Sequence, residues 1–142
     1  MGIGPNIHPI APVTPKRFSL SVAVANTNRD GTGTINTLVT AGLNGTVVPR
    51  IRARSALAVT TVPTLQVLRL WHRIANAGSW FLIDEVALGA VAATSAIVGQ
   101  LIDFNLTNIL LGGGATAATT DLLGVTQHVA EAVHYSGEQG DY

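Results

Sequence analysis

The chain has 142 residues, of which 47% are hydrophobic and only 11% are charged, against about 25% charged residues in ordinary globular domains. Eight basic residues balance eight acidic ones and there is no cysteine, which argues against a strongly basic nucleic-acid binder and excludes both a disulfide scaffold and a cysteine-based zinc site. A chain without net charge and with a positive mean hydropathy favours association with further copies or a larger assembly over existence as a free monomer.

The first predicted element is an extended N-terminal arm, residues 1–17, ahead of a β-sandwich domain at 18–142. Four prolines recur in this arm. Because proline lacks an N–H group and fixes φ, neither a helix nor a central strand is expected there. We expect a polyproline-like segment that lies on a neighbouring subunit, with a free tail as the alternative. Its apolar anchors are Ile3, Ile7, Ile10 and Val13.

The domain is predicted to begin with a series of strands. Residues 18–25 alternate large apolar side chains with serine or alanine, which is typical of a half-buried strand. Asp30-Gly31 lies in a stretch dense in turn residues and favours a hairpin to a second strand at 34–40. A third strand at 46–59 contains Pro49, which indicates a sheet edge or a bulge.

The second half of the chain is less clearly patterned. Residues 64–74 fit either a helix or a strand, and a helix is the main alternative at 85–101. A strand is expected at 80–88, a short apolar run follows at 106–111, and residues 125–136 are expected to form a last strand or pair of strands before a polar terminus at 137–142. With about eight short strands and frequent turns, the chain is predicted to be all-β, an antiparallel β-sandwich or jelly roll.

Membrane insertion and export are not expected. The uncharged, alanine-rich run at residues 86–102 has 17 positions, whereas a spanning helix needs about 20 mainly apolar residues. The N-terminus also lacks a basic region followed by an apolar core, so no signal peptide is expected.

Candidate metal and catalytic groups are sparse. Asn26, Asn28 and Asp30 match the opening of a calcium loop, but the twelfth position is Thr37 where a bidentate Glu is needed. A turn in which these side chains bond to their own backbone is the preferred interpretation. The four histidines are scattered, and no nucleophile elbow or phosphate loop is present. We therefore expect no enzyme and no cofactor.

Three arginines are the most informative charges. In a strand, Arg50, Arg52 and Arg54 share one face, with Ile51 and Ala53 on the other. Like charges so close repel one another unless an anion faces them. The face is either a solvated edge that discourages aggregation or a docking surface for carboxylates of a partner or a neighbouring copy.

Two tryptophans flank a short loop at 75–79. Trp71 and Trp80 are either core residues or anchors at an interface, where tryptophan is enriched.

One stretch resembles a known family. Residues 25–34, with the sequence ANTNRDGTGT, resemble the opening of small structural proteins encoded beside the head genes of tailed bacteriophages. Residues 40–45 are similar to the turn that follows in that family, and Arg50-Ile51-Arg52 to its next strand. Residues 67–70, 80–86 and 140–142 match later parts of the pattern. The resemblance covers most of residues 18–142 and implies a virion β-sandwich, without catalytic residues, that decorates or cements the capsid.

The expected function is therefore that of a capsid decoration or cement protein on the outside of a bacteriophage head. The expected partners are the major capsid protein and further copies of this chain, with a homotrimer favoured at threefold positions; nucleic acid and membrane are not expected. A tail, connector or fibre component is one alternative. A host-attachment jelly roll is another, in which Trp71 and Trp80 form a stacking platform for glycans.

Overall fold

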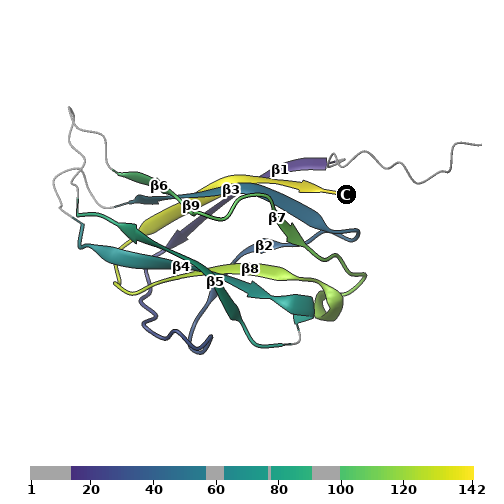
Figure 1. Cartoon of the computed structure of the whole chain (residues 1–142), viewed down its shortest axis with the longest axis horizontal. Coiled ribbons are helices and arrows are strands. Elements are labelled where there is room, and N and C mark those ends of the chain that lie inside the picture. Colours follow the sequence, from purple (N-terminus) through teal and green to yellow (C-terminus); the bar gives the residue numbers. More distant parts are fainter. Residues whose placement is uncertain (1–13, 57–62, 77, 91–99) are drawn as a thin grey trace, which may run out of the picture.

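The computed structural model describes residues 14–56, 63–76, 78–90 and 100–142. Within them, nine strands form two antiparallel sheets that lie face to face (Figure 1). The five-stranded sheet contains β1 (Thr14–Val22), β9 (Val133–Asp141), β3 (Thr46–Ser55), β6 (Leu101–Asp103) and β7 (Ile109–Leu111). The four-stranded sheet contains β2 (Asn36–Thr40), β8 (Leu122–Gln127), β4 (Gln66–Arg73) and β5 (Phe81–Leu88).

The strand order is that of a jelly roll. The first sheet runs β1-β9-β3-β6 and the second β2-β8-β4-β5. β6 and β7 pair with different parts of β3, at Arg52–Arg54 and Thr46–Val48, so together they occupy the place of one strand. Eight strand positions in two sheets, with consecutive strands mostly in opposite sheets, make the jelly roll. The predicted fold class, an all-β antiparallel sandwich, is confirmed.

The core lies between the inner faces of the two sheets. Leu68 and Leu70 of β4 face Ile51 of β3 and Tyr135 of β9, and all four side chains are fully buried. In β3, buried Ile51 and Ala53 alternate with the more exposed arginines, as the two-residue period of a strand requires.

Several strand boundaries differ from the prediction. β1 begins at Thr14, so residues 14–17, assigned to the arm by their prolines, pair with β9. Pro15 is tolerated because β1 is an edge strand. The predicted anchors Ile3, Ile7, Ile10 and Val13 lie outside the described residues.

The predicted hairpin at Asp30-Gly31 is wrong. β1 and β2 belong to different sheets, and the segment between them crosses from one to the other. The turn residues do bend the backbone, since Gly31 and Gly33 both have positive φ. Turn chemistry fixes the local path of the chain, but it does not decide which strands pair.

The ambiguous regions resolve mainly as strand. Residues 66–73 form β4 rather than a helix, and β5 continues to Leu88. The helical alternative at 85–101 otherwise lies largely in residues outside the described part. The only helices described are two single 3-10 turns, η1 (Ile74–Asn76) and η2 (Ala117–Thr119), and none in the described ranges has the length and apolarity to cross a membrane.

The predicted polar terminus at 137–142 is also wrong. Most of it belongs to β9, which lies between β1 and β3. Its glycines and polar residues have low β propensity, yet hydrogen bonding to a strand on each side keeps the segment extended.

Candidate docking surface

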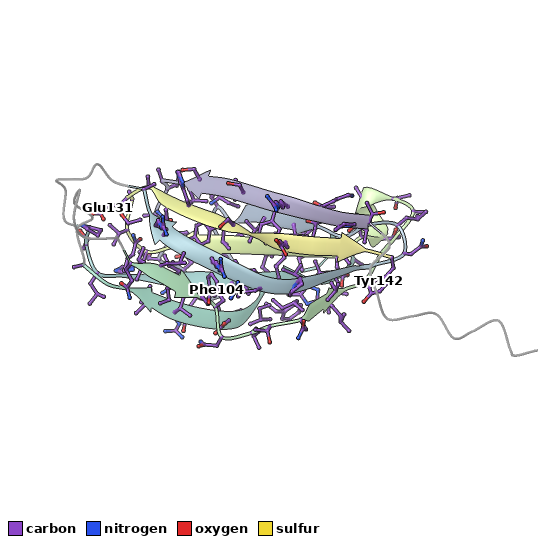
Figure 2. All side chains as sticks on the ribbon, turned by 90° about the horizontal axis from the view of Figure 1, so that it is seen from above. Phe104, Glu131 and Tyr142 are labelled. Atoms are coloured by element: carbon purple, nitrogen blue, oxygen red, sulfur yellow. The ribbon has the colours of Figure 1, made fainter. Side chains whose placement is uncertain are left out.

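The outer face of the five-stranded sheet gathers the arginines. In an antiparallel sheet, directly paired residues point to the same side. The pairing places Arg17, Glu138 and Arg50 in one row across β1, β9 and β3. Figure 2 looks down on this face, with the three strands side by side. The next two rows contain Ser19, Ser136, Arg52 and Asp103, and then Ser21, His134, Arg54 and Leu101.

This face concentrates the positive charge of a neutral chain. Arg17, Arg50, Arg52 and Arg54 are four of its eight basic residues, and they share the face with two carboxylates. The sequence pattern around Arg17 does not assign it to this group. Only the pairing of β1 with β9, more than a hundred residues away in sequence, brings it beside the other three.

The arginines are loosely held. Arg50 Nη1 lies 3.8 Å from Asp103 Oδ2, and Arg52 Nε lies 3.4 Å from Asp103 Oδ1. Both distances exceed the roughly 2.7–2.9 Å of a good charge-assisted hydrogen bond. Arg52 Nε is buried and has no hydrogen-bond partner among the described residues. These guanidinium groups therefore retain donors for a further ligand.

Three charges on the face have no ion pair with any described residue. Within the described part of the chain, no salt bridge joins Arg17, Arg54 or Glu138 to another side chain. Glu138 lies between Arg17 and Arg50 in the row and moderates the repulsion between them without being bound tightly to either.

The face is hollowed along β9. A groove of about 620 Å³ is lined by Arg17, Arg50 and Arg52 together with two serines, Phe18, Pro49, Gly137 and Glu138. A second hollow of about 410 Å³ adjoins it, sharing Arg17, Pro49 and Glu138. The hollow can therefore accept a segment of chain rather than a single small ion.

Pro49 marks a bulge, as one of its two predicted interpretations required. The register of β3 against β9 shifts between Val47 and Arg50, which lets proline occupy a strand inside a sheet. β3 has neighbours on both sides. The interpretation of Arg50, Arg52 and Arg54 as protection for a sheet edge is therefore wrong, and the docking interpretation stays a prediction.

The outer face of the four-stranded sheet is covered by the chain itself. In the segment between β1 and β2, Asn26 N donates to Gln127 O at 2.7 Å. The Arg69 guanidinium, almost fully buried, donates to Asn26 O at 3.2 Å and to Glu85 Oε1 at 2.8 Å. Arg29 of the same segment donates to Glu85 Oε2 at 2.8 Å. This sheet face is thereby closed to a partner over the covered part.

The predicted calcium-loop residues build that covering segment. Asn26 Nδ2 donates to the carbonyls of Thr32 and Thr34, both at 3.0 Å, and its Oδ1 accepts from Asn28 N at 3.0 Å. A hydrogen bond from the Thr32 hydroxyl lowers the pKa of Asp30, helped by one from the Thr32 N–H. These side chains bond within their own segment. No cluster of three His, Asp or Glu suited to a metal occurs in the described ranges.

The two tryptophans differ in role. Trp71 is 1% exposed and its Nε1 donates to the buried Thr126 hydroxyl at 2.9 Å, so its ring is not available to a ligand. Trp80 is partly exposed, with its ring against Gly124 and the Arg73 guanidinium 5.9 Å from the ring centre. The structure therefore does not pair them as a stacking platform.

Asp121 joins three connections at one end of the sandwich. Its carboxylate accepts from Ala75 N at 2.7 Å, Gly112 N at 2.9 Å and His72 Nε2 at 3.0 Å. Burial alone would raise the pKa of Asp121, but these hydrogen bonds and the charge of His72 hold it below its usual value. Ala75 has a φ of 53°, a strained conformation that its bond to Asp121 helps to hold.

Comparisons with known proteins give little more. No protein-family model and no curated protein match the chain. A chain in the structure of infectious bursal disease virus, Gx strain, is 13% identical with a TM-score of 0.36, over 91% of this chain and 33% of that one. A chain in the structure of the Gt strain of the same virus is 13% identical with a TM-score of 0.32, over 98% of this chain and 34% of that one.

This chain thus spans about a third of the virus chains it matches. The similarity is distant, and TM-scores this low carry no functional argument. The resemblance to bacteriophage structural proteins stays a prediction.

Proposed function

We propose that this chain is a structural protein of a virus particle, a capsid decoration or cement protein that binds the outside of a bacteriophage head. The observation that carries the proposal is the outer face of the five-stranded sheet. It is a broad, hollowed surface with four guanidinium groups and two carboxylates on a chain of zero net charge. Such a face suits attachment to a partner protein, and the proposal includes no catalytic role.

The jelly-roll topology supports this proposal without deciding it. Viral capsid proteins use this architecture, but so do lectins and cupins, and a fold alone does not fix a function. The lectin-like alternative loses its sequence-based support, because Trp71 is buried. The resemblance to phage structural proteins in residues 25–34 and 40–45 favours the virion.

Two of the motifs behind that resemblance meet in space. Tyr142 N donates to Gly45 O at 3.1 Å, and Asn44 Nδ2 donates to Tyr142 O at 3.2 Å. The Asp141 carboxylate beside them accepts from Thr46 Oγ1 at 2.5 Å and from the Lys16 ammonium group. The shared residues therefore maintain the sandwich, which is what a structural family would retain.

The proposed mechanism is stabilisation by mass action. A protein that binds only the assembled shell favours the shell, by about 2.7 kcal/mol per site when its concentration is a hundred times Kd. A stable contact of this kind buries roughly 800 Å² on each partner. The proposed partners are the major capsid protein and further copies of this chain, with a trimer at threefold positions, on the surface of the head.

The test is the number of copies of this protein in purified virions relative to the major capsid protein, by quantitative mass spectrometry. A ratio close to that of the capsid protein supports decoration or cementing. A few copies per particle would assign the protein to the tail, connector or fibre, and absence from the particle would refute a virion role. Adding the protein to undecorated capsids should then raise their melting temperature.

A further inference from the structure

We propose that the groove on the outer face of the five-stranded sheet binds an extended acidic segment of the partner protein, with carboxylates at alternate positions. We further propose that Asp103 pairs with Arg50 and Arg52 until that segment displaces it. This inference rests on the proposed function, because it names the chemistry by which the partner would be recognised.

The spacing of the arginines defines the shape of the ligand. Arg50, Arg52 and Arg54 follow one another at every second residue of β3, a repeat of about 6.6–6.8 Å. A second extended chain has the same repeat, with alternate side chains on one face. An acidic residue at every second position therefore meets one guanidinium after another, whereas consecutive acidic residues would turn half their carboxylates away.

The groove supplies further donors beside β3. Arg17 lies across β9 from Arg50 with Glu138 between them, and Ser19 and Ser136 of the next row also line the hollow. Arginine binds carboxylates with two parallel hydrogen bonds, and a serine hydroxyl can donate one more. The ligand is thus held across the width of the groove as well as along it.

Asp103 shows where an incoming carboxylate would bind. It contacts both Arg50 and Arg52, but only at 3.8 and 3.4 Å, and the buried Arg52 Nε has no hydrogen bond. Its side chain is about half exposed, so water competes for both partners. A carboxylate that reaches the guanidinium groups at shorter distance satisfies them better and competes directly with Asp103.

The surroundings favour protein over nucleic acid as the source of the anions. Single-stranded nucleic acids bind where aromatic rings stack on the bases beside a basic groove. Among the described residues, the one aromatic side chain lining the groove is that of Phe18, which packs against the core. Glu138 and Asp103 would also repel a chain with a phosphate at every step, whereas an alternating acidic peptide can place its uncharged residues beside them.

The binding experiment uses the whole chain and three synthetic octapeptides. One alternates threonine and glutamate, the second has the same composition in two blocks, and the third replaces every glutamate with glutamine. Binding is measured by fluorescence anisotropy at low and at physiological salt. The alternating peptide is expected to bind at least about threefold more tightly than the block peptide, and the glutamine peptide to show no binding.

Four variants test the residues. Arg52→Gln and Arg50→Gln are expected to weaken binding of the alternating peptide by about tenfold, while Asp103→Asn strengthens it several-fold. Arg29→Gln removes the same charge from the opposite side of the molecule and is expected to leave binding almost unchanged. Circular dichroism confirms that each variant is folded.

Several results would overturn the inference. They are equal binding of the alternating and block peptides, no gain from Asp103→Asn, an equal loss with Arg29→Gln, or tighter binding of an eight-residue oligothymidylate. Capsid binding separates the two proposals. If Arg50→Gln and Arg52→Gln decorate capsids as well as the unmodified chain, the inference fails and the proposed function stands. If the unmodified chain binds the alternating peptide but not capsids, the proposed function fails.

Discussion

Asn26→Asp is expected to destabilise the fold far more than the same change two residues later. Asn26 is 7% exposed and donates through Nδ2 to two carbonyl oxygens, each at 3.0 Å. The substitution keeps the shape of the side chain but replaces both donors with an oxygen that faces two acceptors. Losing two hydrogen bonds costs about 1 kcal/mol each, and placing a buried carboxylate against two carbonyl oxygens adds to this. We expect a loss of about 3 kcal/mol at pH 7.5.

The pH dependence sharpens this prediction. The introduced carboxyl lies against carbonyl oxygens in a buried position, so its pKa in the folded state is raised above the ordinary value of about 3.9. Because this pKa is raised, the substitution lowers the free energy of unfolding by its full amount at a pH above the folded-state pKa. The loss becomes smaller as the pH falls from the folded-state pKa to the unfolded-state pKa, because the protonated acid can again donate one hydrogen bond.

The assay is urea unfolding of the Asn26→Asp variant and of the unmodified chain at pH 7.5 and at pH 4.5. Asn28→Asp is the matched control, because that side chain is exposed and its amide donates a single bond, to the Thr32 hydroxyl; a loss below about 1 kcal/mol is expected there. Equal losses of stability for the two variants, or a loss for Asn26→Asp that is no smaller at pH 4.5, would show that the Asn26 amide does not stabilise the conformation of this segment.

Three further substitutions test the packing. Gly124→Ala places a Cβ 2.9 Å from the Trp80 ring and should lower the free energy of unfolding by about 1–3 kcal/mol, measured by urea titration; an unchanged midpoint would contradict the contact. Trp71→Phe leaves the Thr126 hydroxyl without its donor in a buried site, for an expected loss of about 1–3 kcal/mol in thermal unfolding. Asp121→Asn should lower the free energy of unfolding at pH 7. Because the folded-state pKa of Asp121 lies below its ordinary value of 3.8, the difference in stability from the unmodified chain should become smaller as the pH falls through and below that value. A constant difference in stability from pH 7 to pH 3 would refute the role of its charge.

Local alternation in the sequence predicts the faces of β3 correctly. Arg50 and Arg52 are outside while Ile51 and Ala53 are fully buried, because a strand turns successive side chains to opposite sides. Sequence reasoning of this local kind also predicts an all-β sandwich and a sheet edge or a bulge at Pro49, of which the structure shows the bulge. Each of these conclusions needs only neighbouring residues.

Pairing between distant strands could not be predicted in this way. Arg17 joins the arginines of β3 only because β9 lies between β1 and β3, and no periodicity within residues 14–22 indicates that neighbour. The prediction for residues 137–142 is wrong for the same reason, since Gly137 and Gly140 gain their extended conformation from strands on either side. Burial of Trp71 on the outer face of its sheet likewise depends on a segment that crosses from the opposite sheet.

The two short strands β6 and β7, which together take the place of one strand beside β3, affect how molecules of this protein associate at high concentration. β6 and β7 have three residues each, and between them Asn108 N and Phe104 N reach back to the carbonyls of Pro49 and Ile51 at 3.0 Å. This side of the sheet therefore offers no long row of free backbone groups, and short edge strands are one means by which proteins avoid templating β-aggregates. Molecules of this protein can be concentrated side by side while association through merged sheets remains disfavoured along this edge.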